Sequence, residues 1–228
     1  MAVEFALLIL AAYLLGSVPA AYLLAKYSRG VDLRRYGSGN VGATNLLSLT
    51  SKRIALPVMI FDFGKGMVMV WLAHLVGLDF TQQIVVGLAA IIGHNWPVFL
   101  RFSGGRGILT TIGVGLILPL IHGIAPWAMT VFATIAIPSV CLKRAPQGIT
   151  VGLAAVPPAS WGFSDPPVLI IGYLVMFLLV IVRRLAVPRA DIAASLSKRE
   201  VLLNRLLFDR DVRDREVWLN RLSAGQEE

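Results

Sequence analysis

The chain has 228 residues, of which 57% are hydrophobic and only 15% are charged, and its mean hydropathy is +0.74. Because a soluble domain has roughly 45–50% apolar and about 25% charged residues, this composition indicates a membrane protein. Basic loops and a basic tail lying against anionic lipid account for the net charge of +8 without nucleic acid as a partner. The single cysteine, Cys141, excludes an intrachain disulfide and makes no metal site by itself.

Seven apolar segments follow one another along the chain. Some approach the roughly 20 residues that a membrane-spanning helix needs, whereas others are at or below about 17. The first is too long for a signal peptide, and cations follow it instead of preceding it, so we interpret it as a span. The sequence predicts an all-α integral membrane protein with seven transmembrane helices, at 3–25, 54–78, 83–100, 107–125, 126–142, 148–163 and 166–182.

The charges predict the orientation of these spans. Every Lys and Arg except Lys65 falls in the 26–53 loop, in the turn near 101–106, at 143–144 or after residue 182. If the N-terminus is outside, all of these segments lie on one side, which the positive-inside rule makes cytoplasmic. The C-terminus is then cytoplasmic as well.

The chain is expected to form one membrane domain over 1–184 and a basic cytoplasmic tail over 185–228. Apolar residues recur among the many charges of this tail, which favours amphipathic helices on the membrane surface over a fully solvated helical tail. They are Val201, Leu202, Leu206, Val217, Trp218 and Leu222.

The predicted loop between the first two spans contains GSGNVGATN at residues 37–45. Its glycines match G-x-G-x-x-G, but a dinucleotide site needs a strand before this motif, where this chain has a membrane span. Glycines let backbone N–H groups converge on an anion, and short polar side chains add donors. The loop is thus either an oxyanion site or a tight turn between helices. Its candidate ligands are Gly37, Ser38, Gly39, Asn40, Gly42, Thr44 and Asn45.

A second glycine-rich stretch, GHNWPVFLRFSGGRGILTT at 93–111, is predicted on the same side of the membrane. Gly104, Gly105 and Gly107 surround Arg106 just before an apolar helix. An anion there would meet free N–H groups at a helix N-terminus and a guanidinium group. Since both loops border the membrane, they indicate a ligand with a phosphate and a lipid tail.

Three ionisable residues lie in or beside the predicted spans. Asp62 and Lys65 are three apart in the second span, where a charge is costly, so we expect them to pair or to face a polar cavity. His94, at the membrane boundary, could be a general acid or base, a phosphate contact or an interfacial cap. His74 and Asp79 have the H-x-x-x-x-D spacing of another acyltransferase superfamily, but they are predicted on the outer side, away from both glycine loops.

Four stretches of the chain resemble, in order and spacing, the bacterial acyl-phosphate:glycerol-3-phosphate acyltransferase family, the PlsY-type membrane acyltransferases. The resemblance runs from the first span to at least residue 150. The stretches are LLGSVPAAYLLAK (14–26), GVDLRRYGSGNVGATN (30–45), FDFGKG (61–66) and GHNWPVFLRFSGGRG (93–107).

This resemblance implies transfer of a fatty acyl group from acyl phosphate to the 1-hydroxyl of glycerol 3-phosphate, giving lysophosphatidic acid and phosphate in the first step of phospholipid synthesis. Acyl phosphate is already activated, so the site has to bind phosphates, orient the hydroxyl and stabilise an oxyanion. The resemblance implies no metal, no cofactor and no coenzyme A. It also implies the bacterial inner membrane, with the active site facing the cytoplasm.

The resemblance further implies a set of site residues. Ser38, His94 and Arg106 would be catalytic, and the other loop residues named above would bind phosphate. LLNRLLFDRD at 202–211 resembles the family's C-terminal motif and adds Asn204 and Arg205. The chain departs from the family at Ser48, where an arginine is usual, at Ser103, where a lysine is usual, and at Gln147 in a normally serine-rich motif.

Alternative functions stay open at this stage. A transporter or flippase of a phosphorylated lipid or solute would also have glycine loops and an intramembrane Asp62–Lys65 pair, but its outer loops would be expected to be more polar. A lipid phosphatase would need a second histidine near His94. A divergent relative would have a changed acyl donor or acceptor.

Overall fold

The computed structural model describes residues 1–36, 39–187 and 190–220, and within these ranges the chain forms helices and no strands. Short 3-10 turns, η1 (Leu33–Arg35), η2 (Val98–Leu100) and η3 (Asp191–Ala193), separate some of the helices. The α-helices are α1 (Ala2–Ser17), α2 (Ala20–Arg29), α3 (Ala43–Leu49), α4 (Lys52–Leu75), α5 (Phe80–Asn95), α6 (Ile108–Ile121), α7 (Trp127–Cys141), α8 (Ala145–Gly162), α9 (Pro167–Leu185), α10 (Lys198–Phe208) and α11 (Arg215–Asn220).

Among the described residues, four helical segments are long and apolar enough to cross a membrane, namely Ala2–Arg29, Lys52–Leu75, Phe80–Leu100 and Pro167–Leu185. The helices α6 and α7 are apolar but shorter, and α8 has 18 residues that include three prolines and polar groups near both ends. Each of the seven predicted segments overlaps one of these helical segments. The all-helical membrane fold is therefore confirmed, while the count of seven crossings stays a prediction.

The first predicted span is broken in the structure. Helix α1 ends at Ser17, and α2 begins after Pro19, whose ring nitrogen has no hydrogen to donate. In a continuous helix the N–H of Ala20 would donate to Gly16 O, but here it donates to Val18 O at 3.1 Å. The break therefore leaves the carbonyl of Gly16 available to another partner.

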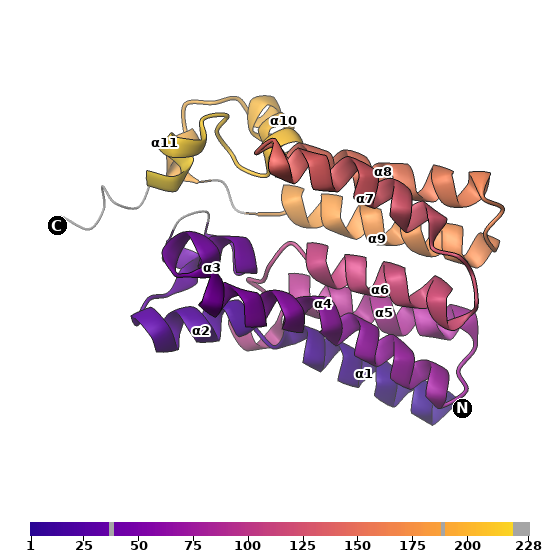
Figure 1. Cartoon of the computed structure of the whole chain (residues 1–228). Helices are drawn as coiled ribbons and strands as arrows, with labels where there is room; N and C mark the ends of the chain where they lie inside the picture. The colour runs from indigo at the N-terminus through magenta and orange to yellow at the C-terminus, as the bar shows by residue number, and fades with distance from the viewer. Residues whose placement is uncertain (37–38, 188–189, 221–228) are drawn as a thin grey trace.

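Figure 1 shows the helices side by side in a bundle, with the N-terminus at one end and the C-terminal helices α10 and α11 at the other, near α2 and α3. Helix α1 packs on α5, α4 on α5 and α6, and α7 on α8. Helix α9 contacts α5, α6 and α8, and α10 contacts α8 and α9. The tail thus packs against the end of the bundle at which both glycine-rich loops are found.

Glycines permit very close helix packing in this bundle. A Cβ atom on Gly93 would lie 2.2 Å from the carbonyl oxygen of Tyr13, and one on Gly113 would lie 2.1 Å from that of Phe63. In a membrane, where hydrophobicity does not drive helices together, small residues allow the backbone contact that stabilises the pair. These glycines are therefore part of the packing of α1 on α5 and of α4 on α6.

We expect the substitution Gly113→Ala to destabilise the protein by about 1–3 kcal/mol, because its methyl group would collide with a backbone carbonyl that no side-chain rotation can move away. Gly64→Ala is the matched control, since Gly64 lies on α4 with nothing within 4 Å of its added Cβ. Thermal unfolding in detergent should show a lower Tm for Gly113→Ala alone. Equal Tm values for both variants would contradict this packing role.

Candidate functional site

A buried polar cluster joins α1, α4 and α5. The ammonium nitrogen of Lys65 lies 2.9 Å from Asp62 Oδ1, 2.9 Å from Gly16 O and 2.9 Å from His94 Nδ1. The side chain of Lys65 is 1% exposed and that of Asp62 is 4% exposed. The structure thus brings together the two intramembrane charges and His94, and it adds the carbonyl that the break after α1 makes available.

The cluster opens onto a small pocket. Asp62 and His94 contribute to its wall together with the break between α1 and α2, Val41 of the first glycine-rich loop, and Gly104 and Gly105 of the second. The residues that line the pocket are Gly16, Ser17, Val18, Pro19, Ala20, Ala21, Val41, Asp62, His94, Pro97, Gly104 and Gly105. The two glycine-rich loops, far apart in the sequence, therefore meet beside His94.

The second glycine-rich loop lies directly against His94. The N–H of Gly105 donates to His94 O at 3.1 Å, and a Cβ on Gly105 would lie 2.1 Å from His94 Nε2. Gly107 precedes α6 with a left-handed φ of 69°, and a Cβ there would lie 2.4 Å from Asn95 Oδ1. These glycines are required because the side chains of His94 and Asn95 on α5 occupy the space that any larger residue would need.

Arg183, near the end of α9, holds this loop from the other side. Its Nη2 donates to Gly104 O at 2.8 Å and its Nε donates to Gly105 O at 3.0 Å. The guanidinium also lies over the Trp96 ring, 5.8 Å from its centroid. The sequence-based predictions missed Arg183, although an arginine pair ending an apolar helix was a visible signal.

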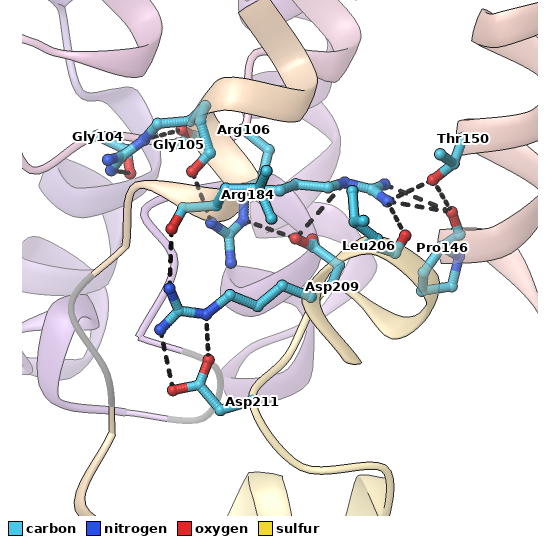
Figure 2. A network of polar contacts seen from close by, with 12 residues as sticks. Gly104, Gly105, Arg106, Pro146, Thr150, Arg184, Leu206, Asp209 and Asp211 are labelled. Atoms are coloured by element: carbon cyan, nitrogen blue, oxygen red, sulfur yellow. Dashed lines mark hydrogen bonds and ion pairs between the residues drawn. The ribbon is translucent and has the colours of Figure 1, made fainter. Parts of the chain in front are cut away.

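Arg106 points toward the C-terminal tail and does not line the pocket with His94. Its Nε lies 2.9 Å from Asp209 Oδ1, and its Nη1 donates to Arg183 O at 3.3 Å. Figure 2 shows the Asp209 carboxylate between Arg106 and Arg184, whose Nε is 3.6 Å away. The contacts of Arg106 and Arg184 with Asp209 are ion pairs without hydrogen-bond geometry, so this one carboxylate compensates two buried cations.

Asn45 is buried, and its amide shapes the first glycine-rich loop. Its Nδ2 donates to Leu33 O, Tyr36 O and Asn40 O at 2.9–3.2 Å. Thr44 lies exposed on α3, whose N-cap is Gly42. The predicted ligands Gly37 and Ser38 lie outside the described residues, and Gly39 has a left-handed φ of 69°.

A local ion pair precedes this loop. Asp32 caps η1 by accepting the N–H of Arg34, and its carboxylate lies 2.6 Å from Arg34 Nη2. This hydrogen-bonded guanidinium lowers the pKa of Asp32. Arg34 is therefore held at the start of the loop in an exposed position.

The tail residues Asn204 and Arg205 bind the tail's own backbone and acids. Arg205 forms a two-point contact with Asp211, with Nε–Oδ1 at 2.6 Å and Nη2–Oδ2 at 3.2 Å, and it donates to Leu185 O at 2.9 Å. Asn204 Nδ2 donates to Asp211 O at 2.9 Å. Neither residue contributes to the pocket beside His94. The Arg205 contact with Leu185 O fastens α10 to the end of α9, whereas the Asn204 contact holds the segment that follows α10.

The positions that depart from the family pattern also have defined places. Ser48 Oγ donates to Asn45 O at 2.7 Å, and Ser103 is exposed at the start of the second loop. Gln147 is half-buried in the first turn of α8. Arg184 reaches this turn and hydrogen-bonds Thr150 Oγ1, as Figure 2 shows.

His74 and Asp79 lie at the opposite end of α4 and α5 from His94 and Lys65. Asp79 is the N-cap of α5 and forms a capping box with Gln82. His74 Nδ1 lies 3.4 Å from Gln83 Nε2, and Gln83 Oε1 lies 2.8 Å from His122 Nε2. These contacts cap and pack helices.

Ser17 is a pocket residue that the sequence-based predictions did not single out. It is fully buried, and its Oγ has no hydrogen-bond partner within the described ranges. A buried hydroxyl without a partner costs free energy unless a ligand or water satisfies it. A polar residue directly before Val-Pro in an apolar span was the signal in the sequence.

Comparison with known proteins finds that the chain is similar, in sequence and in structure, to glycerol-3-phosphate acyltransferases. The family model described as "Glycerol-3-phosphate acyltransferase" matches residues 6–190. "Glycerol-3-phosphate acyltransferase 5" of Dehalococcoides mccartyi is 44% identical over 100% of this chain and 98% of its own length. "Glycerol-3-phosphate acyltransferase" of Pseudomonas putida is 44% identical over 57% of this chain and 70% of its own.

A solved structure has the same fold. The crystal structure of PlsY (YgiH), an integral membrane glycerol 3-phosphate acyltransferase, in its glycerol 3-phosphate form matches with a TM-score of 0.71 and 30% identity. The match covers 79% of this chain and 88% of that one. The lysophosphatidic acid form of the same enzyme matches with a TM-score of 0.68.

We expect Asp211→Asn to release the tail, because it leaves the buried Arg205 guanidinium without its carboxylate, a loss worth about 3–5 kcal/mol for a buried pair. Asp214→Asn is the control, since Asp214 is exposed and accepts backbone N–H groups at the start of α11, as asparagine also can. Limited trypsin digestion followed by intact mass should remove the tail faster in Asp211→Asn. The same rate of removal in both variants would show that the pair does not hold the tail.

Proposed function

The chain belongs to the glycerol-3-phosphate acyltransferase family and is a membrane acyltransferase that acts on glycerol 3-phosphate, and we propose that its acyl donor is an acyl phosphate. The fatty acyl group would pass to the 1-hydroxyl of glycerol 3-phosphate, giving lysophosphatidic acid and inorganic phosphate. The enzyme thereby supplies phospholipid synthesis. Coenzyme A, a metal and other cofactors have no part in this proposal.

The convergence of the two glycine-rich loops on one pocket carries the proposal. Val41 of the first loop and Gly104 and Gly105 of the second line this pocket, with His94 and Asp62 in its wall. Glycine-rich backbone near a helix N-terminus suits phosphate oxygens, and the proposed reaction has a phosphate on each substrate. An apolar bundle beside the pocket provides a surface for an acyl chain.

The chemistry of an acyl phosphate fits a site that has positioned donors. The 1-hydroxyl oxygen attacks the acyl carbon, the bond from this carbon to the phosphate oxygen breaks, and the hydroxyl proton leaves with the phosphate. Since the mixed anhydride is already activated, the protein has to hold both substrates and to stabilise the developing oxyanion. Ser38, His94, Arg106 and the loop glycines are the residues we assign to these tasks.

We also propose the orientation of the enzyme. The bundle would cross the bacterial inner membrane seven times, with the N-terminus outside and the pocket, both glycine-rich loops and the tail on the cytoplasmic side. Figure 1 shows the N-terminus and the C-terminal helices at opposite ends of the bundle, which supports an odd number of crossings. The basic loops at 26–53, 101–106 and 143–144 support the cytoplasmic assignment.

The purified protein in a lipid environment should release phosphate and form lysophosphatidic acid from palmitoyl phosphate and glycerol 3-phosphate, with both substrates required. Mass spectrometry of the lipid and a phosphate assay measure the two products. Palmitoyl coenzyme A in place of palmitoyl phosphate is the control and should give no product. Product from the coenzyme A ester alone would overturn the proposed donor.

Arg106 and Asp209 provide a test of the second loop. If Arg106 binds substrate phosphate, Arg106→Gln should raise the KM for an anionic substrate or reduce turnover by about 10²-fold, since a charge-assisted contact is lost. Asp209→Asn keeps the cation and tolerates the left-handed backbone at this position, so it should leave the KM unchanged or lower it. Steady-state kinetics distinguish the two variants. Equal losses in both would mean that Arg106 serves only to anchor the tail.

A further inference from the structure

We infer that Lys65 is a positioning residue that fixes His94 as a neutral hydrogen-bond donor through Nε2, so that His94 stabilises a substrate oxyanion and does not act as a general base. This inference rests on the proposed function of the same pocket. It assigns a task to Lys65 and a chemical state to His94.

The hydrogen count of the Lys65 ammonium carries the first step. An ammonium group has three hydrogens and no acceptor. Lys65 Nζ has three acceptors at 2.9 Å, which are Gly16 O, Asp62 Oδ1 and His94 Nδ1. Each hydrogen is therefore directed to one of them, and Nδ1 of His94 has to present its lone pair.

The charge balance of the cluster leads to the same state. Asp62 and Lys65 compensate each other in a site from which water is nearly excluded. A proton on His94 Nδ1 would face the ammonium at 2.9 Å, and a fully protonated ring would add an uncompensated charge. Asp62 Oδ1 lies at 3.4 Å from His94 Nδ1, farther than either of their contacts with Lys65, so the ammonium is the partner of both.

The ring proton of a neutral histidine then resides on Nε2. This atom points toward the second glycine-rich loop, since a Cβ on Gly105 would lie 2.1 Å from it. In the part of the chain that the structure describes, Nε2 has no hydrogen-bond partner. His94 thus offers an N–H group to the pocket at the place where both loops meet.

A fixed N–H group in such a pocket can stabilise negative charge on an oxygen of the acyl phosphate as the hydroxyl attacks. The hydroxyl proton still leaves with the phosphate, so no group of the protein has to accept it. Lys65 acts through His94 and does not touch substrate. Gly16 O completes the ammonium's coordination, which explains why the break after α1 lies at this depth in the bundle.

The tautomer can be measured without any assay of activity. Histidine labelled with ¹⁵N in the ring, in protein reconstituted in lipid bilayers, gives distinct solid-state NMR shifts for protonated and unprotonated nitrogens. The variant His74→Gln/His122→Gln leaves His94 as the only labelled residue, because the chain has three histidines. We expect protonated Nε2 and unprotonated Nδ1 near neutral pH. A proton on Nδ1, alone or together with Nε2, overturns the inference.

Substitutions test the role of the donor. Glutamine places an amide N–H group the same number of bonds from Cα as Nε2, whereas asparagine reaches only as far as Nδ1. With palmitoyl phosphate and glycerol 3-phosphate, His94→Gln should retain at least tenfold more kcat than His94→Asn or His94→Ala, which should lose about 10²-fold or more relative to the wild type. Equal loss in all three variants would overturn the donor role.

The double variant Asp62→Asn/Lys65→Met removes the ammonium without leaving a buried charge. We expect the NMR spectrum of His94 to lose its single Nε2–H state and kcat to fall while the KM values change less than twofold. An unchanged spectrum in this variant would show that Lys65 does not set the tautomer. If palmitoyl phosphate is not a substrate at all, the proposed donor fails, whereas the NMR result still decides the state of His94.

Discussion

The ammonium of Lys65 is the contact on which the centre of the bundle depends. A charge at this depth is tolerated only with partners, and the chain provides them from three helices, through Gly16 of α1, Asp62 of α4 and His94 of α5. Helix α6 joins the group because Thr110 Oγ1 donates to Asp62 O at 2.8 Å. The buried charge thereby fixes the relative depth of three helices, the Thr110 hydrogen bond adds a fourth, and the pocket lies beside the charge.

A pair of consecutive arginines has a similar effect at the end of α9. Neighbouring residues on an α-helix project about 100° apart, so Arg183 and Arg184 reach different parts of the molecule. Arg183 holds the carbonyls of the second glycine-rich loop, whereas Arg184 contacts α8 and, through Leu206 O and Asp209, the tail. The shape of the loop and the position of the tail therefore depend on the same turn of one helix.

The polar groups of the pocket are mostly backbone and neutral donors. Glycines bring the main chain of the second loop into contact with His94. The side-chain amide of Asn45 holds the first loop by donating to backbone carbonyls within and just before this loop. Such a site suits the proposed acyl phosphate donor, because rigid donors aimed at the developing negative charge usually make the largest single contribution to catalysis. At Ser48, where the family resemblance predicts an arginine, the side chain donates to the backbone carbonyl of Asn45 and adds no positive charge.

The sequence by itself determined the class of protein, the apolar segments, the all-helical fold and the family, because these follow from composition, hydrophobic length and long motifs. It also required that Asp62 and Lys65 be compensated, since isolated charges are costly in a membrane. Only the tertiary structure decided which partners they have. The break at Pro19 depends on local backbone geometry. The ion pair of Arg106 with Asp209 and the hydrogen bonds of Arg183 to the second glycine-rich loop join segments that are 77 or more residues apart. Hydrophobic patterns do not encode such contacts, because they specify which face of a helix is buried but not which polar atoms meet when helices pack.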